Sequence, residues 1–227
     1  MPIDNNSDQP EHSEIDKAEN EAMLSPLEAR ILGALMEKQL TTPDAYPLTL
    51  NSLVLACNQK TSREPIMSLN EGEVKACLYD LQNRELVEFD YGSRADKFKQ
   101  NLTRTLHFNE AEHAVFCIML LRGPQTVSEL LSRTQRMNEF KNVAEVNELI
   151  TNLLSKITPL IKKMPQQSGQ REERVMHLLC GEPEFSAIKT AKPSHTTQES
   201  TTELAARVEE LEKQVEWLLE QVKQSDQ

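Results

Sequence analysis

Residues that could do metal or nucleophile chemistry are few in this sequence, and their spacing is unfavourable for either. No pair of cysteines has the short separation that zinc ligands usually show. Most of them fall on apolar stripes or runs, which predicts buried and inert thiols. The cysteines are Cys57, Cys77, Cys117 and Cys180. We therefore expect no metal, no cofactor and no disulfide framework.

Motifs of known catalytic mechanism are also missing. The sequence contains no nucleophile elbow, no phosphate-binding loop and no metalloprotease helix. Asp44 and Tyr46 could line a pocket. Because Asp is a common helix cap, we instead expect Asp44 to cap the helix that follows and Tyr46 to pack against it. The protein is predicted not to be an enzyme.

Basic side chains gather in segments that are expected to be loops and hairpins. Such positions suit contacts to phosphates, which supply affinity without reading a base sequence. The alternative is that these are ordinary solvated loop charges. The candidate phosphate-binding residues are Lys60, Arg63, Arg94, Lys97, Lys99, Arg104, Arg133, Arg136, Lys162, Lys163, Arg171 and Arg174.

The net charge of −11 would argue against a nucleic-acid partner if it were evenly spread, but it is not. Residues 1–24 hold seven acids and one base, and residues 181–227 hold ten acids and five bases. The segment between them is electrically balanced, with 19 acids and 19 bases. All of the net acidity therefore lies outside residues 25–180, so composition alone does not exclude DNA.

The elements that would position these basic residues follow from periodicity and capping signals. Helices are expected over 25–40, from Pro47 or Leu48 to Cys57, and over 70–84. A strand at 86–89, a turn at 90–93 and a return strand at 97–108 follow. Three helices and then a hairpin is the winged-helix order, with the second and third helices forming a helix-turn-helix and the hairpin forming the wing.

The same order recurs in the second half of the chain. Helices are expected at 109–121, after Thr126 and at 142–156, and strands at 160–164 and 174–179. Offsets of 84, 77 and 72 residues superimpose the two series, and the offset changes only within expected loops. The predicted fold is mainly α with small β-hairpins (α+β), with two tandem winged-helix domains at 25–108 and 109–181.

The two ends of the chain differ from this body. Residues 1–24 have the composition of a disordered acidic arm, and residues 182–202 that of a flexible linker. Residues 203–224 are expected to form a coiled-coil helix, which either pairs two chains, recruits a partner, or folds back on the body. Its heptad seam is Leu204, Val208, Leu211, Val215, Leu218 and Val222. No signal peptide or membrane span is expected, so the predicted location is the cytoplasm.

Two strings of the sequence are distinctive enough to suggest a family. They run from Thr41 to Leu53, continuing to Pro65, and from Leu121 to Thr126. Their characteristic residues are Pro43, Asp44, Tyr46, Pro47, Asn51, Asn58, Gln59, Gly123, Pro124 and Gln125. Over residues 25–180 the chain resembles the YceH family of uncharacterised bacterial proteins. The resemblance implies tandem winged helices in a bacterial cytoplasmic protein, and it implies no activity or ligand.

Two functions are compatible with this pattern. The first is DNA binding of a transcription-regulator type, with wings and loops contacting phosphates. The second is a protein-interaction module that uses the winged helices and the coiled-coil tail without DNA. The expected recognition helices each carry a charge balance of −1, which disfavours two independent major-groove readers and keeps the second function open.

Overall fold

The computed structural model describes residues 23–92, 95–166 and 172–181. The described residues all fall within one compact unit. The acidic arm up to residue 22, the linker and the heptad helix with its seam of Leu204, Val208, Leu211, Val215, Leu218 and Val222 lie outside the described residues. These three assignments stay predictions.

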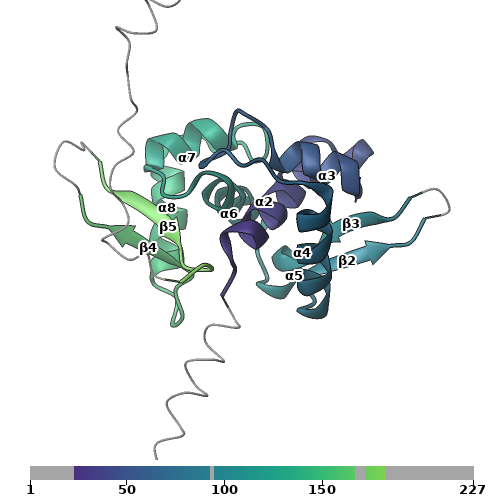
Figure 1. Cartoon of the computed structure of the whole chain (residues 1–227). Helices are drawn as coiled ribbons and strands as arrows, with labels where there is room; N and C mark the ends of the chain where they lie inside the picture. The colour runs from purple at the N-terminus through teal and green to yellow at the C-terminus, as the bar shows by residue number, and fades with distance from the viewer. Residues whose placement is uncertain (1–22, 93–94, 167–171, 182–227) are drawn as a thin grey trace, which may run out of the picture. The chain divides into compact units, whose positions relative to one another are not determined.

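The first half of the described chain contains helices and one small sheet (Figure 1). The elements are α2 (Pro26–Thr41), η1 (Pro43–Ala45), β1 (Leu48–Thr49), α3 (Leu50–Cys57), α4 (Glu71–Asn83), β2 (Val87–Asp90), β3 (Lys97–Gln100) and α5 (Leu102–Thr105). The second half has α6 (Glu110–Arg122), α7 (Val127–Thr134), α8 (Val143–Leu154), β4 (Ile161–Met164) and β5 (Arg174–His177). This mixture of helices and antiparallel strands confirms the α+β part of the predicted fold class.

The strand pairing of the two halves is alike. In the first half β3 lies between β1 and β2, and Leu48 pairs with Phe98. In the second half β4 pairs with β5, and Gln125, just before α7, forms an isolated bridge to Val175 of β5. An offset of 77 residues carries the first pair onto the second. The short edge strand β1 is therefore reduced to a single bridging residue in the second half.

Helix starts also coincide between the halves, because the same capping chemistry recurs at the expected offsets. Ser25 and Asn109 each accept a hydrogen bond from the backbone N–H of a glutamate three residues on, which closes a capping box. Thr49 and Thr126 cap α3 and α7, and Asn70 and Asn142 cap α4 and α8. Each cap satisfies a backbone donor that the helix leaves without a partner.

Three local expectations are wrong. Thr49, not Asp44, caps α3, because Pro47 and Leu48 precede the helix and Leu48 enters the sheet. Asp44 lies exposed in η1 without a capping bond. The return strand ends at Gln100, since its side chain bonds the backbone N–H of Thr103 and the chain turns into α5. Arg104, expected on the wing strand, therefore lies on a helix.

The core runs through both halves, and its centre is the contact between α2 and α6 (Figure 1). Gly33 makes this contact possible, because a Cβ added there would lie 2.9 Å from two side-chain atoms of Leu121. Cys117 of α6 reaches the Gly33 carbonyl with its thiol at 3.5 Å. The predicted boundary between residues 108 and 109 falls in the turn before α6, and it stays a prediction.

The loop between α3 and α4 has no regular structure, and buried side chains from α2 and from the loop itself hold it. Arg30 donates to the carbonyls of Cys57 at 3.2 Å and Pro65 at 2.5 Å. Arg63 donates to the Ala56 carbonyl at 3.0 Å and pairs in a bidentate manner with Glu37 of α2. Because buried carbonyls need donors, these two guanidiniums replace the hydrogen bonds that secondary structure would otherwise supply.

The close approach of α2 and α6 generates a first prediction. Gly33→Val will lower the free energy of unfolding by about 2 kcal/mol, because the added methyl groups overpack the contact with Leu121. Thermal or denaturant unfolding followed by circular dichroism measures the change. The matched variant Gly72→Val changes a helix position whose Cβ would meet only the Asn70 side chain, at 3.2 Å. If both variants lost the same free energy of unfolding, the loss would come from helix propensity and not from packing.

The Glu37–Arg63 pair generates a second prediction. Burial alone would raise the pKa of Glu37, but the hydrogen bonds and charge of Arg63 outweigh it and hold the pKa below its ordinary value. The stability from this pair is therefore present above the unfolded-state pKa of about 4.3 and is lost as pH falls through the lower folded-state pKa. Glu37→Gln will cost about 3 kcal/mol at neutral pH, because it leaves Arg63 buried without a counter-charge.

Denaturant unfolding of wild type and Glu37→Gln between neutral and strongly acidic pH measures this. The difference between them will shrink below pH about 4.3. Glu88→Gln is the control, because Glu88 and Lys99 form an ion pair at 2.8 Å whose side chains are 49% and 39% exposed. Such exposed pairs contribute little, so this variant will unfold like wild type. If the difference in the free energy of unfolding between Glu37→Gln and wild type did not change with pH, the stabilising role given to the Glu37–Arg63 pair would be wrong.

Candidate nucleic-acid interface

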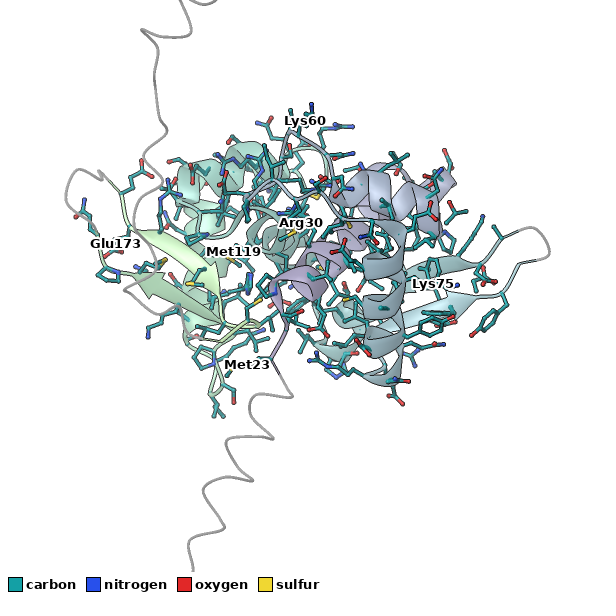
Figure 2. All side chains as sticks on the ribbon, in the orientation of Figure 1. Met23, Arg30, Lys60, Lys75, Met119 and Glu173 are labelled. Atoms are coloured by element: carbon teal, nitrogen blue, oxygen red, sulfur yellow. The ribbon has the colours of Figure 1, made fainter. Side chains whose placement is uncertain are left out.

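Four of the predicted phosphate-binding residues are exposed, and their side chains make no hydrogen bond or ion pair in the described part of the chain. They are Lys60, Lys97, Arg104 and Arg136. Lys60 lies in the loop between α3 and α4, where Figure 2 shows it at the outer edge of the ribbon. Lys97 opens β3, Arg104 lies on α5, and Arg136 follows α7. These side chains can meet a ligand without first giving up a partner.

The remaining hairpin lysines have neighbours of opposite charge or other contacts. Lys99 pairs with Glu88 across β2 and β3, and Lys163 pairs with Glu173 at 3.1 Å across the second hairpin. Both pairs are exposed, so they cost little to break. Lys162 is half-buried on β4 and also has a contact. Arg94 and Arg171 lie outside the described residues.

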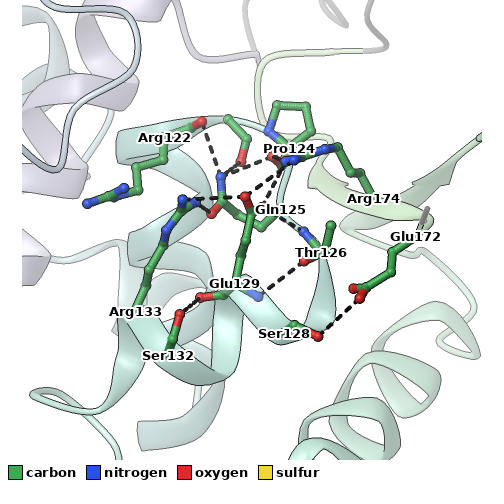
Figure 3. Close-up of polar contacts among 11 residues, drawn as sticks. Arg122, Pro124, Gln125, Thr126, Ser128, Glu129, Ser132, Arg133, Glu172 and Arg174 are labelled. Atoms are coloured by element: carbon green, nitrogen blue, oxygen red, sulfur yellow. Dashed lines mark hydrogen bonds and ion pairs between the residues drawn. The ribbon is translucent and has the colours of Figure 1, made fainter. Parts of the chain in front are cut away.

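Arg133 and Arg174 meet at one carboxylate, that of Glu129 on α7 (Figure 3). Arg174 donates to Glu129 at 2.8 Å and also to the Pro124 carbonyl at 2.8 Å. Arg133 donates to Glu129 at 3.4 Å and to the Gln125 side chain. Burial would raise the pKa of Glu129, but the Thr126 N–H and Arg174, followed by the charge of Arg133, hold that pKa below its ordinary value.

Arg63 differs from the other candidates, because its side chain is fully buried. It pairs with Glu37 and holds the loop between α3 and α4 from inside. A phosphate cannot reach a guanidinium with 0% exposure, so the prediction of Arg63 as a phosphate contact is replaced by a structural role. The sequence pattern missed this because Glu37 is 26 residues away on another helix.

The residues of the first distinctive string build the entry to α3 and the loop after it. The Tyr46 hydroxyl accepts the backbone N–H of Gln100 at 2.7 Å, which ties this string to β3. Asn58 exchanges two hydrogen bonds with the backbone of Leu69 and closes the loop. Pro43, Asp44 and Asn51 are exposed, and Pro47 and Gln59 are half-buried. Burial raises the pKa of Tyr46 to about 12.

The second string makes a rigid turn between α6 and α7. Gly123 adopts φ 69°, the left-handed region that ends a helix easily when the residue is glycine. The Gln125 amide donates to the carbonyls of Arg122, Gly123 and Pro124 (Figure 3). The two strings meet, because the Glu64 N–H donates to the Leu121 carbonyl at 2.8 Å. The structure thus unites segments that lie almost 60 residues apart in the chain.

Arg122 is a charged residue that sequence reasoning passed over, although it lies within the second string. Its Nε is buried without a hydrogen-bond partner. Burial, followed by the charges of Arg133 and Arg63, lowers the pKa of this guanidinium. A cation in the last turn of a helix is common, since it complements the helix dipole, so the sequence pattern alone did not distinguish Arg122.

The cysteines behave as predicted in one respect. Burial raises the pKa of Cys57 and of Cys77 to about 12 and that of Cys180 to about 11, and it raises the pKa of the fully buried Cys117 as well. All four are free thiols, and three are buried. In the described segments no cluster of three or more metal-ligating side chains occurs, nor does any helix there have the length and apolar character to cross a membrane.

Comparison with known proteins places the chain among bacterial relatives. A family profile described as "Protein of unknown function, DUF480" matches residues 24–170. A UPF0502 protein of Cellvibrio japonicus is 52% identical over 88% of this chain and 93% of its own length. UPF0502 proteins of Vibrio atlanticus and Ectopseudomonas mendocina are 44% and 45% identical, over 88% and 83% of this chain and 94% and 89% of theirs. The chain therefore belongs to the DUF480 (UPF0502) family of uncharacterised bacterial proteins.

Proposed function

We propose that the protein is a cytoplasmic, non-enzymatic DNA-binding protein of a transcription-regulator type, built from two tandem winged helices. The observation that carries the proposal is the order of elements. Helix, edge strand, two helices and a hairpin occur in the first half, with sheet order β1-β3-β2. The second half repeats the order with Gln125 in place of the edge strand. Helix-turn-helix folds with a wing are widely used to bind DNA, but the fold supports this function only by analogy.

The distribution of accessible charge also supports binding to a phosphate backbone. Lys60, Lys97, Arg104 and Arg136 are exposed and without partners in the described chain, and they lie on loops, a hairpin and a short helix. Helix α4, the expected recognition helix, instead exposes Glu71, Glu73 and Asp80 beside Lys75. We therefore propose contacts mainly to phosphates, with little base readout from α4.

This proposal predicts salt-dependent DNA binding by the full-length protein. The logarithm of the association constant for a duplex will fall linearly with the logarithm of salt concentration, with a slope of about −0.9 per phosphate contact. The double variant Lys60→Gln/Lys97→Gln will bind more weakly, with a slope shallower by about 1.8. Fluorescence anisotropy with a labelled duplex measures both constants. Absence of binding by wild type at low salt would overturn the proposal.

The control is Lys75→Gln, which removes one exposed cation from α4. If contacts are made by loops and wings, this variant will retain the wild-type slope. If Lys75→Gln lost more affinity for the duplex than the double variant, the DNA would lie on the recognition helix. The proposed mode of contact would then be wrong.

A second candidate, a protein-interaction module, is favoured by an aromatic surface formed by α4, β2 and the residue that follows β2. Tyr79 and Tyr91 are 48% and 71% exposed, and both lie against Phe89, with ring centroids 5.3 and 6.0 Å from it. Exposed Tyr beside acidic residues is more typical of a protein-binding surface than of one for DNA. The heptad tail would then add a second contact, with a partner or with another copy of the chain.

This surface generates a stability prediction. Tyr79→Ser/Tyr91→Ser will change the free energy of unfolding by less than about 1 kcal/mol, because exposed side chains contribute little to the fold. Phe98→Ala, which removes the buried ring beneath Phe89, will cost about 3 kcal/mol. Chemical denaturation measures both. If the double Tyr variant is as unstable as Phe98→Ala, the tyrosines serve the core and the second candidate loses its support.

A further inference from the structure

The strongest unexplained feature of the molecule is the guanidinium of Arg122. It ends α6 at the point where the two distinctive strings meet. Figure 3 shows the side chain extending away from the turn, and only the backbone carbonyl of Arg122 takes part in the contacts drawn there. Across the described residues, no hydrogen bond or ion pair of this guanidinium is found.

The surroundings of Arg122 make it unfavourable for the guanidinium to lack a partner in the unliganded protein. Its Nε is shut off from solvent without an acceptor, while the residue as a whole keeps part of its surface exposed. Arg133 and Arg63 are close enough to act on its charge. A partly desolvated cation beside two others is unfavourable, and no carboxylate in the described fold is bonded to it.

Nearby carboxylates do not neutralise the group. Glu37 is bound in a bidentate manner by Arg63. Glu129 is shared between Arg133 and Arg174. Both acids act on Arg122 only at a distance. The arginines around the turn therefore outnumber the carboxylates that could neutralise them. The excess positive charge favours an anion.

The turn itself is built to keep Arg122 in place. Gln125 donates to three successive carbonyls, and Arg174 donates to the carbonyl of Pro124. On the other side, Glu64 bonds the carbonyl of Leu121. A rigid backbone lowers the entropy that a ligand contact would otherwise cost. A guanidinium also suits an oxyanion better than an ammonium does, because it can donate two parallel hydrogen bonds.

We propose that Arg122 is the anchor of an oxyanion site that takes a backbone phosphate of bound DNA, between the loop that carries Lys60 and the start of α7. The proposal rests on the proposed function for the identity of the ligand. The anion binds the terminal nitrogens of the guanidinium, because Nε is shut off from solvent. This explains why the described fold leaves the group without a partner.

The test compares full-length wild type with Arg122→Met, Arg122→Lys and Lys75→Met. Arg122→Met will weaken binding to a labelled duplex about tenfold at low salt and make the salt slope shallower by about 0.9. Arg122→Lys will keep the slope but lose part of the affinity, since a lysine cannot donate in a bidentate manner. Lys75→Met removes one charge of the same sign and will bind like wild type.

Thermal unfolding without DNA provides a readout that a structural role would not produce. If Arg122 serves a ligand, Arg122→Met will unfold at the same temperature as wild type or higher, because an uncompensated cation has been removed. A lower unfolding temperature together with unchanged DNA affinity would overturn the proposal. Unchanged DNA affinity alone would also overturn it, and the proposed function would still stand.

If wild type itself fails to bind DNA, the proposed function fails, and the site is tested with inorganic phosphate. The probe is the NMR signal of the Arg122 Nε–H, assigned by its loss in Arg122→Lys. A saturable shift of this signal with phosphate, absent for the arginine side chains elsewhere on the surface, would support an oxyanion site. No shift up to phosphate concentrations well above physiological ones would overturn it.

Discussion

The buried ion pair between Arg63 and Glu37 is the interaction on which the arrangement of the first half depends. The loop between α3 and α4 lacks regular hydrogen bonding, so its buried carbonyls need donors from elsewhere. Arg63 and Arg30 supply them from inside the protein. The same loop carries Glu64, whose backbone N–H donates to the carbonyl of Leu121 in the second half.

The role of an arginine in this protein depends on which acids surround it. Arg63 has a carboxylate of its own and therefore belongs to the fold. Arg133 and Arg174 share one and are partly compensated. Arg122 has none within bonding distance in the described residues, so its charge remains available to a ligand. All four are arginines, but they lie in a loop, on two helices and on a strand, and it is their three-dimensional neighbours that separate their roles.

Sequence reasoning predicted the elements well because the signals for helix starts are local. Ser25 and Thr126 cap helices through glutamates three residues away, and such patterns can be recognised in the sequence alone. The ends of elements were less predictable. The return strand stops at Gln100 because of bonds to Gln39 and Thr103, and the first of these partners is 61 residues away.

The candidate site was predicted less completely, for the same reason. Loop lysines such as Lys60 were identified correctly as exposed, since a polar loop seldom buries its charges. The burial of Arg63 and the lack of a partner for Arg122 both depend on contacts between segments far apart in the chain. No periodicity or composition signal reports such contacts, so these two assignments required the structure.

The contact of Gly33 with Leu121 has a consequence for how the gene can vary. The first helix of each half packs against the first helix of the other, so a chain cut between the halves would expose the packed faces of both α2 and α6. An insertion within α2 or α6 would shift this contact out of register. The two halves therefore constrain each other, since a larger side chain at position 33 has to be accommodated by Leu121 in the other half.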